Sequence, residues 1–444
     1  MVTKPKGPID LAKAVYNALR KRNMKGPKEA ILTSLFQIMY FTSLRTEEAE
    51  AITVHVVYVN HNNPDPDPPL HIARDRWRYN RLDTPVELTK STLEKIAKAS
   101  DPRTSSLAIY HDARGKLMIF GLIDQQNKYH DFLNRDTDEG PERPGLFEVS
   151  ILAPGHLAVF ADYEKIAELN IDVLIRNEID VFRSGPIRNV LEPGIQQFLA
   201  TVQEEIYPKL YHDRPELVNL LESQWLSLLT RLLLRVKSYG HGGAILITPD
   251  AKLDGLAKLD GLNVKYEMTY TRLRTALQAQ AISMIQYMFA EDMIEETQKK
   301  SDSIPVELYT DEAINRTDTA ESKREIDGTV WFVSLLTRVD GLVAMTPTLD
   351  VVGFGTEITV SEEPSHIYLS SSRNLTLGNL KRIDYNHFGT RHRSMMRYCA
   401  SVPTSIGFVV SQDGYVRIIT KLEERLIMWD NIKLQSHGPT KVTR

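Results

Sequence analysis

A long helical pattern that leads straight into an apolar strand most constrains the C-terminal half of this chain. Leucines recur three and four residues apart between Pro193 and Lys237, which indicates a helix with a wide apolar face. Glycines at 242 and 243 then open a strand-like run over residues 244–248. We expect the leucine face to be buried in a domain core or in a subunit contact.

The first 160 residues alternate between helix and strand patterns and contain no motif with obvious chemistry. Two helices are predicted over 9–24 and from Pro27, a β-branched strand over 52–59, and a further helix over 85–100 that Thr84 would cap. Two strand pairs are predicted within residues 106–122 and 146–160. The overall prediction is an α/β (α+β) fold with four parts: an N-terminal domain over 1–190, a helical linker over 191–215, a larger domain over 216–430 and a polar tail over 431–444.

Bulk composition excludes several classes of protein. The formal net charge of −4 gives no general basic field for nucleic acid, and the single cysteine, Cys399, excludes a disulfide framework. Cys399 is expected to be a small core residue. The longest lipid-like run, residues 225–236, contains Arg231 and is too short to span a bilayer. With no signal-peptide pattern at its start, the chain is expected to be cytoplasmic.

The strongest candidate for chemistry is a basic run at residues 389–393. Gly389 and Thr390 precede a predicted helix, so free N–H groups and a hydroxyl would meet an anion there. Arg391 and Arg393 would add donors for phosphate oxygens. Adjacent side chains on a helix diverge by about 100°, so His392 and the two arginines cannot all face one point. A solvated basic helix start is the alternative interpretation.

A second candidate lies upstream, where an apolar run ends at Asp340-Gly341. A carboxylate there can hold a divalent metal or accept a proton from a hydroxyl, and the glycine lets a ligand approach the backbone. The alternative is an ordinary turn. Asp-Gly also occurs at 254, 260, 327 and 413, so the dipeptide alone decides nothing.

Together these two motifs resemble the signature of the bacterial diadenylate cyclase domain, over about residues 220–421. The resemblance implies a mixed β-sheet flanked by helices, and an enzyme that condenses two ATP into cyclic di-AMP with Mg²⁺ or Mn²⁺. Each subunit of a face-to-face homo-oligomer would hold one ATP. The N-terminal part is similar to a sensor-type domain that precedes this catalytic domain in some bacterial proteins. An effector protein would then read the product.

The resemblance also implies a role for each candidate residue. Asp340 would lie near the metal and the attacking 3′-hydroxyl, and Asp413 is a second candidate for the metal. The triphosphate and adenine contacts would come from the following residues: Gly341, Leu342, Ile358, Gly389, Thr390, Arg391, His392, Arg393 and Ser411.

The chain departs from the family pattern at three places. Leu342 stands where the family has alanine, Gln412 stands where it has a metal-linked glutamate, and residues 361–388 are expected to form an unusually long polar loop. These differences leave two alternatives open: a different product, linear or made from dATP, and a nucleotide sensor without catalysis. Nucleic-acid binding through Arg391, Arg393 and Arg397 is disfavoured, because no aromatic residues interleave with them.

Overall fold

The computed structural model describes most of the chain in two compact units, Met1–Glu178 and Ile179–Arg444. The described residues are 5–24, 26–47, 50–59, 78–100, 105–124, 146–161, 164–175, 179–182, 184–206, 215–249, 260–301, 303–370, 372–412 and 415–434. The loop at 61–71, the tail from residue 435, and Asp254 and Asp413 lie outside them.

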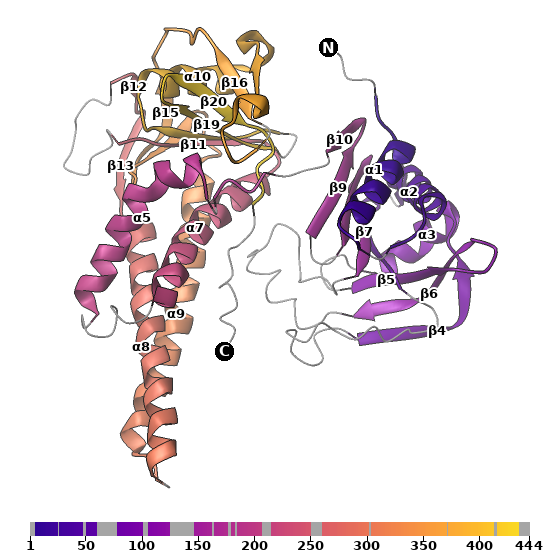
Figure 1. The fold of residues 1–444 in the computed structure, drawn as a ribbon, viewed down its shortest axis with the longest axis horizontal. Helices are drawn as coiled ribbons and strands as arrows, with labels where there is room; N and C mark the ends of the chain where they lie inside the picture. The colour runs from indigo at the N-terminus through magenta and orange to yellow at the C-terminus, as the bar shows by residue number, and fades with distance from the viewer. Residues whose placement is uncertain are drawn as a thin grey trace. The chain divides into compact units, whose positions relative to one another are not determined.

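The first unit is an eight-stranded sheet with helices on one face (Figure 1). Its strand order is β10-β9-β8-β7-β3-β5-β6-β4, in which only β3 and β5 pair in parallel. The helices are α1 (Pro8–Lys21), α2 (Glu29–Ser43) and α3 (Lys90–Ile96), with a 3-10 turn η1 (Ala97–Ala99). The strands are β3 (Val54–Tyr58), β4 (Arg78–Glu87), β5 (Ser105–His111), β6 (Leu117–Asp124), β7 (Phe147–Ala153), β8 (His156–Ala161), β9 (Glu164–Asn170) and β10 (Val173–Ile175), beside a small pair, β1 (Thr46–Glu47) and β2 (Glu50–Ala51).

The predicted helices and strand pairs of this unit are confirmed, except for one boundary. Residues 85–87 belong to β4, and the helix expected from Pro85 begins only at Lys90. Thr89, not Thr84, caps it by accepting a hydrogen bond from the Thr92 backbone N–H at 3.1 Å. Pairing of β4 with β6 supplies hydrogen bonds that a local helix pattern does not reveal.

The second unit is built on a ten-stranded sheet of mixed direction. Its order is β12-β15-β14-β11-β18-β19-β20-β16-β17, with β13 also paired to β15. The strands are β11 (Gly243–Ile247), β12 (Leu262–Asn263), β13 (Tyr266–Tyr270), β14 (Leu342–Met345), β15 (Val351–Ile358), β16 (Ile367–Ser370), β17 (Leu380–Ile383), β18 (Ile406–Val410), β19 (Val416–Leu422) and β20 (Arg425–Trp429). The mixed sheet expected from the sequence is therefore present.

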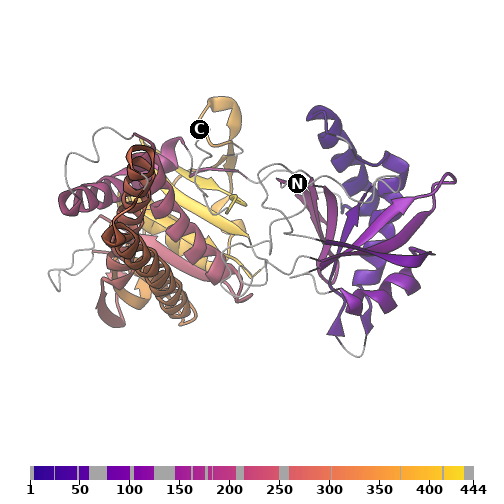
Figure 2. The ribbon, with the colours of Figure 1, turned by 90° about the horizontal axis from the view of Figure 1, so that it is seen from below.

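Helices cover both faces of the central strands. On one face lie α5 (Pro186–Glu205), α7 (Pro215–Lys237), α8 (Arg272–Lys300) and α9 (Val306–Leu336); on the other lies α10 (Thr390–Ser401). Figure 2 shows the first group of helices and the yellow strands as separate layers. In β11, Ala244 and Leu246 face α10, whereas Ile245 and Ile247 face the other helices, as the period-2 geometry of a strand requires.

Two segments of this unit differ from their predicted structures. The charged stretch at 294–327, whose composition predicts a solvated helix plus loop, has no buried residue among those described before Ser322, so its solvation is confirmed. Helix replaces most of the expected loop, because the stretch forms the ends of α8 and α9, a long antiparallel pair that extends away from the sheet (Figure 1). The polar loop expected over 361–388 contains β16 and β17, and β16 pairs in parallel with β20. β16 depends on a partner strand distant in sequence, so the local composition of residues 361–388 does not reveal it.

Residues 191–205, expected in a helical linker, form most of α5, whose apolar side packs in the core of the second unit. No described helix is both long and apolar enough to cross a membrane.

Candidate functional site

The strand directions of the second sheet bring distant parts of the sequence to one edge. β11 and β14 run parallel, so the residues before both strands lie at the same edge. β18 is antiparallel to β11, with Gly243 opposite Val410, so the residues after β18 reach that edge as well. Residues 240–242, 338–341 and 411–412 are therefore neighbours.

Side-chain contacts between these loops agree with the strand pairing. Arg338 Nε donates to His241 Nε2 at 3.3 Å, which joins the segments before β14 and β11. Gly242 has a φ of 71°, and a Cβ on it would lie 2.9 Å from Arg391 Nη1 and 3.4 Å from the Gln412 backbone nitrogen. The positive φ and the Val410 carbonyl oxygen, 2.7 Å from that position, require glycine at 242, and the nearness of Arg391 Nη1 links the start of α10 to the same edge.

Asp340-Gly341 occupies this edge just before β14. The Asp340 side chain is exposed and has no hydrogen bond or ion pair in the described part of the chain. Gly341 has a φ of 114°, and a Cβ there would lie 2.6 Å from the Gly355 carbonyl carbon, so no other residue fits without strain. A hydrogen bond with Glu357 mainly raises the pKa of Lys265, and the negative charge of Asp340 adds to that shift.

Two further candidates for nucleotide contacts, Leu342 and Ile358, lie on neighbouring strands beside Asp340-Gly341. Leu342 is the first residue of β14, is 5% exposed and belongs to the core under α10. Ile358 ends β15, is half-buried and pairs with Leu262 of β12. Since β14 and β15 are antiparallel, with Leu342 opposite Thr356, both residues lie at the edge of Asp340.

The basic run forms the first turn of α10, with Gly389 as its N-cap and both Gly389 and Thr390 exposed. The Arg393 N–H donates to the Gly389 carbonyl at 3.1 Å and closes the turn. Thr390 is the first helical residue, so its hydroxyl is not engaged in capping the helix. The hydroxyl and the first N–H groups of the helix therefore remain as donors for an anion.

The two arginines of the run point to different surroundings, as the helical spacing predicts. Arg391 is exposed and makes no hydrogen bond or ion pair with described residues. The Arg393 guanidinium lies 6.0 Å from the centre of the Tyr385 ring, and the Tyr385 hydroxyl donates to the Arg393 carbonyl at 3.4 Å. Arg391 is thus the freer cation of the two.

His392, in α10, contacts a cation that belongs to β19. Its Nε2 lies 3.0 Å from Nη1 of Arg417 in β19. Burial, with smaller contributions from Arg417 and Arg391, lowers the pKa of His392 to about 4. The imidazole is therefore neutral at pH 7 and adds no positive charge to the edge.

The remaining candidates follow β18. Both the N–H and the hydroxyl of Ser411 donate to the Tyr415 carbonyl, at 2.9 and 3.3 Å, and so tie Ser411 to the residue before β19. Gln412 is exposed. Asp413 lies outside the described residues, and within them no group of three His, Cys, Asp or Glu side chains could hold a metal ion.

Sequence reasoning missed three residues at this edge: Gly242, Lys265 and Arg417. One signal pointed to Arg417, because it is the only charge in the run Val416–Ile419 that otherwise reads as a buried strand. No local signal pointed to Gly242 or Lys265, because the residues near them in the fold, Arg391 and Asp340, are more than 70 residues away in the chain.

Cys399 lies on the buried face of α10, which confirms its expected role in the core. Burial raises the pKa of its thiol to about 12, so the thiol stays protonated at any ordinary pH. We expect the native protein to react with less than about 5% of the thiol-reagent rate of a free cysteine, since the thiolate is the nucleophile. Absorbance with a thiol-specific disulfide reagent at pH 8 measures this, and the denatured protein, with one reacting thiol, is the control. Rapid labelling of folded protein would contradict the burial.

Comparison with known proteins concerns the first unit. Residues 21–124 match a family described as "Probable sensor domain DACNV". Over these residues the N-terminal unit is similar to a sensor-type domain of the kind associated with diadenylate cyclases. The match covers under a quarter of the 444-residue chain and does not reach the second unit. No curated protein matches the chain.

Proposed function

We propose that this protein is a metal-dependent nucleotidyltransferase that condenses two ATP into cyclic di-AMP and releases pyrophosphate. One observation carries the proposal: a carboxylate at residue 340 and a cationic helix start at 389–393 lie at the same sheet edge, where Arg391 Nη1 is next to Gly242. The sensor domain in the first unit supports it, because that family is associated with diadenylate cyclases.

The start of α10 would bind the triphosphate. Arg391 offers a guanidinium without a protein partner among described residues, and Thr390 offers a hydroxyl beside unpaired helix N–H groups. A helix N-terminus favours negative charge, and a guanidinium forms paired hydrogen bonds with phosphate oxygens. These donors suit a nucleoside triphosphate better than an uncharged ligand.

Asp340 would act on the attacking group. Its exposed carboxylate can accept the proton of a 3′-hydroxyl as the 3′-oxygen forms a bond to the α-phosphorus of the other ATP and the bond to pyrophosphate breaks. Two such transfers, one from each nucleotide, close the ring. Since each active site would present one ATP, the reaction needs two subunits face to face.

The residues present fit Mg²⁺ or Mn²⁺ that arrives with the nucleotide. Mg²⁺ is commonly held by one or two carboxylates together with substrate phosphates, and Asp340 provides one such carboxylate. Bound there, the ion would neutralise charge at the reacting phosphate. Asp340 and the phosphates would hold it.

The test is direct. Purified protein is incubated with ATP and Mn²⁺, and the products are separated by chromatography and identified by mass. Cyclic di-AMP and pyrophosphate in a 1:2 ratio are expected. Absence of any phosphodiester product from ATP, dATP or a nucleotide mixture would overturn the proposal.

Two features favour a second candidate function, in which the same site makes another product or only senses a nucleotide. Leu342 is buried where the family has a smaller alanine, and Gln412, an uncharged residue, lies beside Arg391 where the family has glutamate. Mass spectrometry across ATP, dATP and mixtures separates a different product from the expected one. A pure sensor would release ATP unchanged.

Replacing Arg391 isolates the phosphate-binding part of the proposal. Arg391→Met is expected to weaken ATP binding about tenfold, in line with the loss of a charge-assisted hydrogen bond that is partly screened by solvent. Calorimetry with a non-hydrolysable ATP analogue measures the affinity. Arg382→Met, an exposed arginine of β17, is the matched control and should bind like wild type. Equal affinities for the two variants would remove Arg391 from the site.

A further inference from the structure

The geometry around His392 determines which ring nitrogen carries hydrogen. Nε2 lies 3.0 Å from Nη1 of Arg417. A guanidinium has five N–H donors and no acceptor, so Nε2 must accept this hydrogen bond. In a neutral imidazole the hydrogen then resides on Nδ1, which has no partner among the described residues.

Arg417 is itself held in place from the neighbouring strand. Its Nε lies 2.8 Å from Oδ1 of Asp430, directly after β20, in an ion pair whose angles do not make a hydrogen bond. The Arg417 side chain is 17% exposed, so this pairing is partly shielded from water. Asp430 therefore balances the charge of Arg417 and leaves Nη1 to meet His392.

The charges that face the imidazole favour its neutral form. Arg391 and Arg393 flank it on α10, Arg417 faces it from β19, and Asp430 is engaged with Arg417. Burial is the largest cause that lowers the pKa of His392, to about 4, followed by Arg417 and then Arg391. The ring therefore stays uncharged across the physiological range.

We propose that Arg417 is a positioning residue that fixes the tautomer of His392, so that His392 presents its Nδ1–H to a bound anion as a neutral donor. The step from anion to nucleotide phosphate rests on the proposed function. In this arrangement Arg391 supplies the positive charge at the edge, and His392 supplies a neutral hydrogen-bond donor with a fixed orientation. His392 is thus assigned a different role from that of the two arginines beside it in sequence.

Nuclear magnetic resonance on protein labelled with ¹⁵N-histidine tests the tautomer without any nucleotide. The His392 signals are assigned by their loss in His392→Asn. In wild type we expect a single Nδ1–H tautomer that does not titrate between pH 5.5 and 8. In Arg417→Met the Nε2–H tautomer should appear and the imidazole pKa should rise by about one unit, because one facing charge is gone. Arg417→Lys, which still donates, should restore the wild-type tautomer.

Two controls separate this effect from a general loss of structure. Asp430→Asn removes the ion pair but keeps the guanidinium, so the Nδ1–H tautomer should persist. Near-ultraviolet circular dichroism verifies that each variant is folded. An Nε2–H tautomer in wild type, or an unchanged tautomer in folded Arg417→Met, would overturn the proposal.

A matched pair of substitutions tests the link to phosphate. The amide nitrogen of asparagine can occupy the place of Nδ1, whereas that of glutamine reaches the place of Nε2. His392→Asn should therefore bind the ATP analogue within about threefold of wild type and His392→Gln about tenfold more weakly, the loss of roughly one hydrogen bond. The reverse order would overturn the role of Nδ1. If the tautomer results hold and no variant or wild type binds any nucleotide, the proposed function fails while the assignment of Arg417 stands.

Discussion

Asp340→Asn is expected to lower turnover of ATP by about 10² to 10⁴-fold, the usual contribution of a general base. The amide keeps the shape of the carboxylate but can neither accept the proton of a 3′-hydroxyl nor supply negative charge to a metal ion. Nucleotide affinity should change by less than about threefold, because Arg391 and the start of α10 hold the phosphates. Product formation and calorimetry, both in Mn²⁺, give the two quantities.

The matched control is another aspartate before a glycine. Asp260 is exposed and precedes Gly261, whose φ of 79° resembles the left-handed conformation of Gly341. Asp260→Asn should therefore retain wild-type turnover. Equal turnover by wild type and Asp340→Asn would show that Asp340 is only a turn residue.

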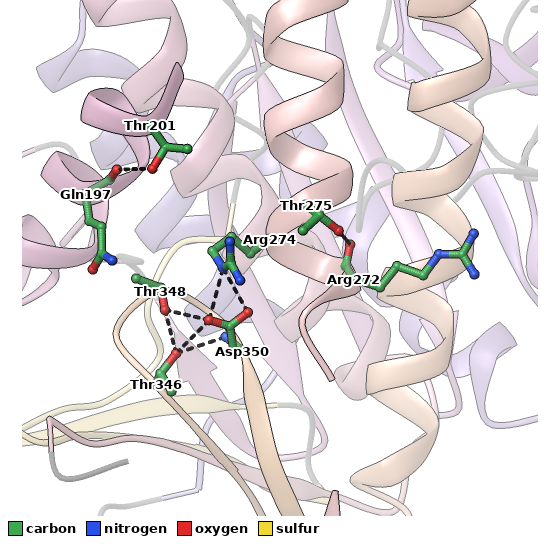
Figure 3. A network of polar contacts seen from close by, with 8 residues as sticks. All are labelled: Gln197, Thr201, Arg272, Arg274, Thr275, Thr346, Thr348 and Asp350. Atoms are coloured by element: carbon green, nitrogen blue, oxygen red, sulfur yellow. Dashed lines mark hydrogen bonds and ion pairs between the residues drawn. The ribbon is translucent and has the colours of Figure 1, made fainter. Parts of the chain in front are cut away.

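Asp350→Ala is expected to destabilise the second unit by about 3 kcal/mol, the lower end of the cost of breaking a buried ion pair. Asp350 is fully buried in the turn between β14 and β15, and both of its oxygens accept from Arg274 Nε of α8, at 2.9 and 3.0 Å (Figure 3). The hydroxyls of Thr348 and Thr346 also reach Asp350 Oδ2, at 2.7 and 3.4 Å. Removal of the carboxylate would leave Arg274 without its counter-ion and the hydroxyls of Thr346 and Thr348 without this acceptor.

Tryptophan fluorescence during urea unfolding measures this loss, because Trp225 and Trp429 are both buried in the core of the second unit. The control is Glu325→Gln, which breaks the exposed Arg272–Glu325 pair at the start of the same helix. That change should cost less than about 0.5 kcal/mol, as is usual for solvent-exposed ion pairs. If both variants unfold at the same urea concentration, Asp350 does not anchor α8.

The double variant Arg274→Met/Asp350→Ala tests whether the two charged side chains stabilise the fold as a pair. With both charges gone, no unpaired guanidinium remains, so its loss of stability should be smaller than the sum of the two single losses. Strict additivity would show that the two side chains act independently. The turn matters for the candidate site because β14 and β15 also carry Leu342 and Ile358 at their other end.

Local patterns predicted the elements that satisfy their own hydrogen bonds or have clear periodicity. The leucine spacing predicted α7, the apolar run after Gly243 predicted β11, and the strand pairs β5–β6 and β7–β8 followed from apolar runs separated by turns. The helix that begins at the basic run was predicted to within one residue. These features are local because side-chain period and turn chemistry are properties of a few neighbouring residues.

Elements that depend on distant partners were predicted poorly. β16 lies within a polar stretch and becomes a strand through its pairing with β20, about 60 residues later. The charged stretch of α8 and α9 is mostly exposed, as its composition indicates, but the two helices pair through residues far apart in sequence, such as Ser283 and Ser322, whose hydroxyls lie 3.1 Å apart. No short window of sequence contains these partners.

The amino-acid sequence by itself determined the chemical groups available: an aspartate before a glycine, and a hydroxyl, two arginines and a histidine at the start of a helix. The tertiary structure decided which of them meet, because the parallel pairing of β11 with β14 and the antiparallel pairing with β18 set their loops at one edge. It also decided their charge. Burial of His392 against Arg417 makes that ring neutral, since a desolvated imidazole beside a guanidinium does not bind a further proton at pH 7.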